Sequence, residues 1–86
     1  MNPRLLEVIS GSIRSVSKRT QTMAITADSL LVEDLALDSL DLVGVLMKLE
    51  DHFQFAIEVD EVPNLLTVAD IGSHIENLLK DRPAAA

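Results

Sequence analysis

The sequence contains no cysteine, tryptophan or tyrosine, and its only phenylalanines are Phe53 and Phe55. Without cysteine the chain can form neither a disulfide framework nor a thiolate metal site, which is typical of an intracellular protein. The scarcity of aromatic side chains also excludes the basic and aromatic surface on which single-stranded nucleic acids stack. We therefore expect hydrophobic packing alone to stabilise the fold, with both phenylalanines in the core.

Long apolar runs are absent as well. No run approaches the roughly 20 residues that span a bilayer, and no compact apolar block follows the first residues as in a signal peptide. We therefore expect a cytoplasmic protein that does not bind membranes. With 86 residues the chain has room for one domain, which we place at residues 1–81, and Pro83 marks a flexible tail at residues 82–86.

Basic residues are outnumbered, since 7 Lys and Arg face 14 Asp and Glu for a formal net charge of -7. The excess is concentrated in residues 34–61, which hold eight acidic residues and one base, Lys48. Such a field repels nucleic acid and anionic membranes but attracts a partner with a basic face. From charge alone, an ordinary solvated face is the alternative.

Apolar spacing predicts an all-α four-helix bundle. Three longer helices are expected at residues 3–18, 38–53 and 68–80, and one short helical turn at residues 60–66. Between the first two helices, residues 19–37 form a long loop whose leucines indicate that it is ordered and packed against the core. Residues 55–59 alternate like a strand but have no partner, so we expect an extended connection.

Capping residues support these boundaries. Asn2 can cap the first helix, Asp38 the second, and Thr67 forms a capping box with Asp70 at the third. In the second helix, the apolar stripe is predicted at Leu40, Val43, Leu46, Met47, Leu49 or Glu50, and Phe53, with Met47 filling the core.

The first helix has a second interpretation. It is rich in Arg and Ser and poor in acids, as mitochondrial presequences are, although its stripe of Leu5, Ile9, Ile13 and Val16 fits a core helix.

Among the residues predicted to begin helices, Ser39 is the one whose side chain suits covalent modification. A serine hydroxyl at a helix N-terminus is exposed beside unpaired amides, which favour an attached phosphate; the alternative is an ordinary Asp-Ser helix start. A catalytic nucleophile is excluded with His52 as base, because thirteen residues of helix separate the two by about 20 Å. His74 has no local signature of such a base. We therefore expect an acceptor for another enzyme, and no enzyme activity.

A metal site is not expected either. Asp34, Ala36 and Asp38 alternate like the first ligands of a calcium loop, but Ser39 replaces the required glycine and Val45 the required glutamate.

A pattern that extends well beyond the tripeptide Asp38-Ser39-Leu40 strongly resembles the acyl carrier protein family. It comprises the run 33–41, then Val43, Leu46, the run 49–51, Phe53, Ile57, Leu65, Thr67, Val68, Ile71 and Ile75. The resemblance implies a four-helix bundle in which a phosphopantetheinyl transferase attaches 4'-phosphopantetheine from coenzyme A to Ser39. The terminal thiol of that arm would carry acyl groups as thioesters in fatty-acid or specialised lipid or polyketide biosynthesis.

The resemblance also implies a docking surface. Basic patches on acyl-transferring and chain-elongating enzymes would meet a surface made of Asp34, Asp38, Leu40, Asp41, Leu42, Met47, Glu50 and Asp51. The core could shelter a growing acyl chain, and a mobile shuttle is expected to be a monomer.

The chain departs from the family pattern at several positions. Ala36 stands where the family usually has glycine, Gly44 where an acid is common, and Leu42, Lys48 and His52 make the second helix less acidic. These differences suggest partners outside housekeeping fatty-acid synthesis. An aminoacyl, peptidyl or polyketide carrier, and a helical interaction module without a prosthetic group, remain alternatives.

Overall fold

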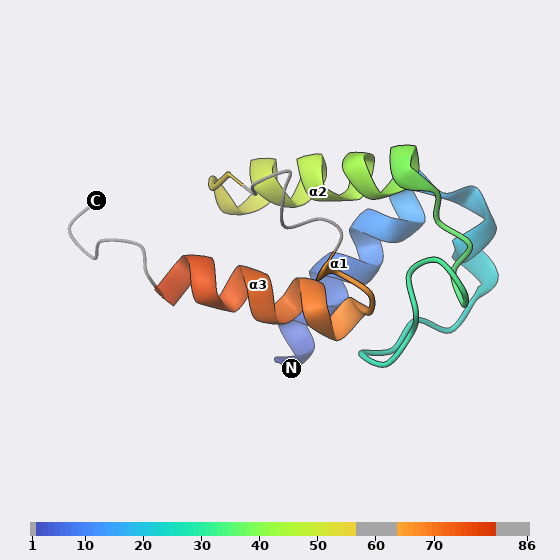
Figure 1. The fold of residues 1–86 in the computed structure, drawn as a ribbon, viewed down its shortest axis with the longest axis horizontal. Coiled ribbons are helices and arrows are strands. Elements are labelled where there is room, and N and C mark those ends of the chain that lie inside the picture. Colours follow the sequence, from blue (N-terminus) through green and yellow to red (C-terminus); the bar gives the residue numbers. More distant parts are fainter. Residues whose placement is uncertain (1, 57–63, 81–86) are drawn as a thin grey trace.

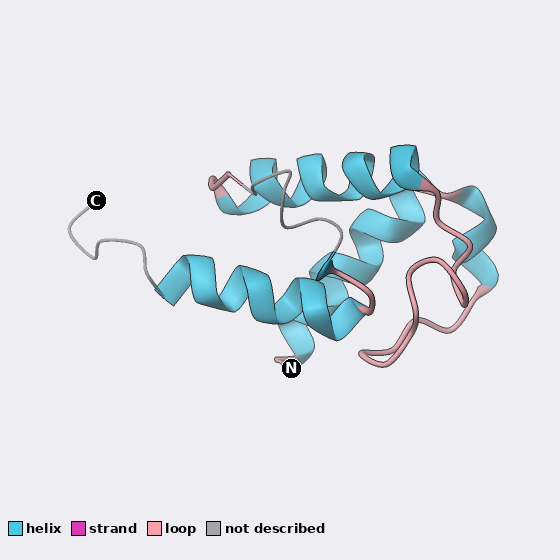
Figure 2. Ribbon diagram, viewed as in Figure 1, coloured by secondary structure: helices cyan, strands magenta, loops and turns pink. Residues whose placement is uncertain are grey.

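The fold is all-α, as predicted, with a short fourth helix in an unexpected place. The computed structural model describes residues 2–56 and 64–80. It contains the helices α1 (Pro3–Val16), α2 (Ser39–Phe53) and α3 (Val68–Lys80), and the 3₁₀ helix η1 (Lys18–Thr22) (Figure 1). Within the described ranges no strand is present, and Figure 2 colours these residues as helix or loop throughout.

α1 begins as its sequence predicts. The Asn2 side chain accepts a hydrogen bond of 2.8 Å from the Arg4 amide, and Pro3 occupies the first turn, where no amide donor is needed. The helix ends at Val16 rather than at residue 18, because the backbone becomes extended at Ser17 and then winds into η1. Thr20 of η1 is buried, and its hydroxyl donates to the Ser17 carbonyl at 2.7 Å.

α1 is the element that packs closely against both other long helices. In Figure 1 it runs obliquely from the N-terminus beside α3 to the beginning of α2, while α2 and α3 run in the same general direction. The core between them consists of Leu5, Ile9, Ile13, Val45, Leu46, Leu49, Leu65, Val68, Ile71 and Ile75. Removing α1 would take three of these side chains away, so α1 is an integral part of this core.

The loop between η1 and α2 is ordered, as its leucines predicted. Leu31, Leu35 and Leu37 are fully buried in the core. The loop is also bonded to the start of α3: Leu31 N–H donates to the Leu66 carbonyl at 2.9 Å, and the Val68 amide donates to Ser29 at 3.1 Å. The segment before Ser39 is therefore held by both packing and backbone hydrogen bonds.

The stripe predicted for α2 is buried only in part, and the prediction that Met47 fills the core was wrong. Leu46 and Leu49 are buried, but Leu40, Val43 and Met47 are exposed. Phe53 lies between these extremes, half-buried against the core with Phe55. α2 thus carries apolar residues on two faces, and only one of them faces the core.

Other predictions fall on residues that the structure does not describe. Residues 57–63 lie outside it, and with them most of the expected turn at 60–66 and of the extended connection at 55–59. The expected tail at 82–86 lies outside it as well. The short helix that the structure does contain, η1, lies in the segment predicted to be loop.

Candidate phosphopantetheine attachment site

Ser39 is the first residue of α2 and is exposed. A reciprocal capping box encloses it: the Asp41 amide donates to Asp38 Oδ1 at 2.8 Å, and the Asp38 amide donates to Asp41 Oδ2 at 3.2 Å. The amides of Ser39 and Leu40 lie inside this box and have no acceptor among the described residues. A phosphate ester on Ser39 would therefore meet free N–H groups at the positive end of the helix.

The loop that leads to Ser39 contains a backbone feature that only the structure reveals. Ala36 has a φ of 55°, in the left-handed region that favours glycine. Buried leucines on both sides, Leu35 and Leu37, hold it there, and the Leu37 amide donates to the Leu31 carbonyl at 3.0 Å. Alanine at position 36 therefore adopts a conformation that glycine would adopt without steric strain.

Three of the predicted docking acids, Asp34, Asp38 and Asp41, accept hydrogen bonds from backbone amides. Asp34 Oδ2 accepts from the Leu30 amide at 2.9 Å and stabilises a turn of the loop. Asp41 is half-buried in the capping box, and Glu50 is half-buried farther along α2. Asp38 and Asp51 are exposed. These acids lie in the loop before α2 and along α2, and they differ in how far they are exposed.

The exposed apolar residues of α2 form a row that begins beside Ser39. Leu40, Val43 and Met47 follow one another at i, i+3 and i+7 and are 80%, 47% and 62% exposed. We call these three residues the apolar ridge. The prediction for Leu42 places it in the docking surface, but the structure has it half-buried against the core. Val43, which the sequence reasoning assigned to the core, takes a place in the ridge.

His52 lies too far along α2 to activate Ser39, and no hydrogen bond joins His74 to Ser39 among the described residues. His52 is near the other end of α2, where it is exposed and makes an edge-to-face contact with Phe53 at 4.7 Å between ring centroids. His74 lies in the middle of α3. In the part of the chain that the structure describes, no group of three or more potential metal ligands is found. The same residues contain no helix long and apolar enough to cross a membrane.

The comparisons with known proteins agree with this geometry. The model of the phosphopantetheine attachment site family matches residues 7–75. The chain belongs to the acyl carrier protein family. It is 41% identical over 59 residues to the acyl carrier protein of Campylobacter hominis, covering 69% of this chain and 75% of that protein.

A second relative and a solved structure extend the comparison. The acyl carrier protein of Exiguobacterium sibiricum is 46% identical over 52 residues, which cover 60% of this chain and 66% of that protein. A solved structure of a candidate acyl carrier protein from Mycobacterium tuberculosis superposes with a TM-score of 0.77 at 32% identity, covering 86% of this chain and 97% of that one.

Membership of this family defines the cofactor, which is covalently attached 4'-phosphopantetheine. The residues around Ser39 fit such a group, since an exposed hydroxyl adjoins two free amides at a helix N-terminus. Proteins of this family are carriers rather than catalysts. A helical module without a prosthetic group does not agree with the family match.

Proposed function

We propose that Ser39 is the attachment point and that the protein carries acyl intermediates as thioesters on the attached arm. The exposed Ser39 hydroxyl inside the capping box of α2 is the observation that carries this proposal. The arm supplies a thiol that the chain itself lacks, since the sequence contains no cysteine. The protein has no need of a catalytic base of its own, because the transferase that modifies it provides one.

We propose further that partner enzymes dock along α2. The apolar ridge starts at Leu40, directly after Ser39, and exposed acids border it at Asp38 and Asp51. A partner with an apolar groove flanked by basic residues would complement this surface. The partners in question are the phosphopantetheinyl transferase and acyl-transferring and chain-elongating enzymes, and the carrier would act as a monomer.

Intact mass spectrometry tests the attachment. After incubation with coenzyme A and a broad-specificity phosphopantetheinyl transferase, one phosphopantetheine should be added per chain. Ser39→Ala should add none, whereas Ser15→Ala, which removes another exposed serine on α1, should be modified like the unaltered protein. Absence of modification in a folded wild-type chain, or modification of Ser39→Ala, would refute the proposal.

Docking is tested by the rate of that modification at limiting carrier concentration. Leu40→Gln and Met47→Gln replace exposed side chains, so they should leave stability within about 0.5 kcal/mol of the wild type. They should raise the KM for the carrier, whereas Val32→Gln, an equally exposed change in the loop, should not. Equal kinetics for all three variants would argue against the ridge.

The cargo distinguishes fatty-acid from specialised biosynthesis. Gly44 and Lys48 replace or offset the negative charge of α2, which favours partners other than the fatty-acid enzymes. We expect transfer of malonyl groups by a fatty-acid malonyltransferase to be slow, and Lys48→Glu to accelerate it. Rates comparable to those of a standard carrier would assign the protein to fatty-acid synthesis, and selective loading with aminoacyl groups would favour a peptidyl carrier.

The cytoplasmic location stays a prediction, as does the single domain at residues 1–81.

A further inference from the structure

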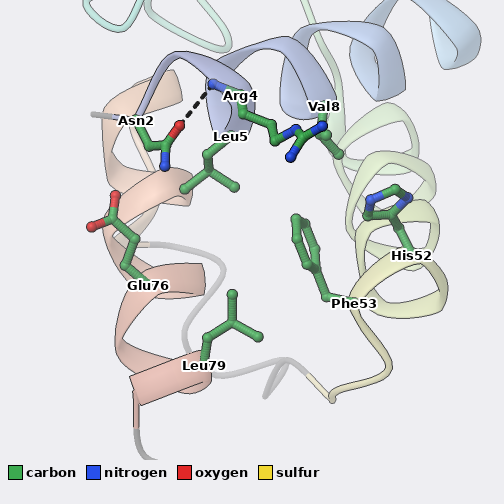
Figure 3. A pocket seen from close by; sticks show the side chains of 8 residues that line it. All are labelled: Asn2, Arg4, Leu5, Val8, His52, Phe53, Glu76 and Leu79. Carbon is green, nitrogen blue, oxygen red and sulfur yellow. Dashed lines mark hydrogen bonds between the residues drawn. The ribbon is translucent and has the colours of Figure 1, made fainter.

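A cavity of about 580 Å³ lies where α1 begins and where α2 and α3 end (Figure 3). Its apolar lining comes from all three helices: Leu5 and Val8 of α1, Phe53 of α2 and Leu79 of α3. Cavities of this volume with mostly apolar walls are typical of small-molecule sites. The cavity is therefore large enough for a ligand and has the lining that an apolar ligand requires.

The packing of the helices explains why the cavity exists. α1 packs closely against both α2 and α3, whereas α2 and α3 approach each other much less closely in the described residues. α2 also stops at Phe53, since Gln54 adopts a left-handed conformation with a φ of 58°. The C-terminal ends of α2 and α3 thus leave a space between them that the side chains of α1 do not fill.

This cavity is separate from the attachment site. Phe53 lies fourteen residues after Ser39 on the same helix, which corresponds to about 21 Å along its axis. The two sites therefore occupy opposite ends of α2. Asn2, Arg4 and Glu76 of its lining are exposed, so the cavity is open to solvent at this end of the bundle.

The rim carries a cation on one side. Figure 3 shows the Arg4 side chain extending from α1 across the opening toward His52, while the Glu76 carboxylate on α3 points away from the cavity. The guanidinium of Arg4 has no hydrogen bond or ion pair within residues 2–56 and 64–80; the Arg4 amide alone is engaged, by Asn2. An anionic group above Phe53 would therefore find a free guanidinium, which pairs well with a carboxylate.

We propose that this cavity binds a free linear aliphatic carboxylate of medium chain length. Its chain would lie against Leu5, Phe53 and Leu79, and its carboxylate would pair with Arg4. The binding is non-covalent and does not involve Ser39, so it goes beyond the carrier function. Such a ligand has the chemistry of a product released from a carrier thioester by hydrolysis, and its binding would let the carrier respond to accumulated product.

Decanoate, below its micelle concentration, is the probe for this site. Two-dimensional amide NMR of the unmodified protein should show saturable shifts that centre on residues 4–8, 52–53 and 76–79. Butyrate, with the same head group and too short a chain, should cause no saturable shifts up to about 1 mM, and decyltrimethylammonium, with the same chain and the opposite charge, should bind more weakly. Ser39→Ala should bind decanoate as the wild type does.

Two variants with matched controls test the contacts. Arg4→Gln should weaken decanoate binding by about 3- to 10-fold, whereas Arg19→Gln on η1 should not change it. Leu79→Gln, at a side chain 36% exposed, should weaken it by at least about 5-fold, and Val32→Gln should have no effect. Circular dichroism identifies any variant that fails to fold, and Arg4 is exposed enough that its substitution is safe.

Several outcomes would overturn the proposal. They are the absence of saturable shifts, shifts centred elsewhere, equal binding by Arg4→Gln, and preference for the cationic probe. Loss of binding in Ser39→Ala would also overturn it, because the aliphatic chain of decanoate would then enter the protein from the Ser39 end of α2. None of these results depends on whether Ser39 accepts phosphopantetheine, so the two proposals can fail separately.

Discussion

Gly44 of α2 lies directly against the branched side chain of Val16 on α1. A β-carbon at position 44 would come within 3.3 Å of Val16 Cγ1 and 3.4 Å of Val16 Cγ2, which is tighter than ordinary packing. Glycine therefore allows α1 and α2 to approach closely at a position where the family resemblance led us to expect an acid. The unusual residue has a packing reason as well as an electrostatic effect.

This contact makes Gly44→Ala depend on residue 16. Alanine gains about 1 kcal/mol over glycine inside a helix, but here the added methyl meets Val16. In a Val16→Ala background the obstruction disappears, so Gly44→Ala should be more favourable there by about 0.5–1 kcal/mol. Urea denaturation of the four proteins of this cycle measures the coupling. Additive effects would show that α1 moves freely to accommodate the methyl group.

Ala36→Gly should stabilise the protein. A φ of 55° carries a steric penalty for alanine, whereas glycine adopts this conformation without one. The greater entropy of glycine in the unfolded chain offsets part of the gain, so we expect a net increase of about 0.5–1 kcal/mol in the free energy of unfolding. Ala24→Gly, at an exposed residue without a positive φ, should instead lower stability. A loss of stability in both variants would contradict the left-handed conformation of Ala36.

The Asp38 cap should matter for stability through its oxygen rather than its charge. Asp38→Ala removes the acceptor of the Asp41 amide and should cost about 1 kcal/mol, whereas Asp38→Asn retains an acceptor and should cost much less. Chemical denaturation compares the two variants. In the phosphopantetheine transfer assay Asp38→Asn should nevertheless be slower than wild type, because it removes a negative charge beside Ser39. If both variants lose the same stability, the cap is not the source of the effect.

Asp70 should contribute a pH-dependent part of the stability. The amides of Leu66 and Thr67 donate to its carboxylate and lower its pKa below the ordinary value of 3.8. Because the folded pKa is the lower one, the contribution is complete above the unfolded pKa and is lost as the pH falls through the folded pKa. Urea denaturation between pH 6 and about 3 should therefore show a steeper loss for the wild type than for Asp70→Asn. Asp28→Asn, at an exposed acid outside this hydrogen-bond pair, should follow the wild-type slope.

Helix starts were the most predictable part of this fold. Asn2, Asp38 and the pair Thr67–Asp70 cap helices as expected, because capping depends on a side chain and amides only two or three residues away. The apolar spacing of α1 identified Leu5, Ile9 and Ile13 as buried, whereas Val16 of the same stripe is half-buried. The position of Ser39 followed from the same local rules.

The parts that failed depend on contacts between distant segments. α2 has apolar residues on opposite faces, and periodicity cannot tell Val45, which is buried, from Met47, which is exposed. The conformation of Ala36 is imposed by neighbouring buried leucines against the preference of alanine. The cavity near Phe53 forms only where the ends of three helices come together, and no local sequence pattern predicts that arrangement.

The central position of α1 determines how this bundle can open. Separating α2 from α1 would expose Ile9, Ile13 and the tight junction at Gly44, whereas parting α2 from α3 breaks few close backbone approaches. Thermal fluctuations should therefore widen the seam between α2 and α3 while α1 stays attached to each. A protein that binds the outer face of α2 would then change the width of this seam while the contacts of α1 with the other two helices stay intact.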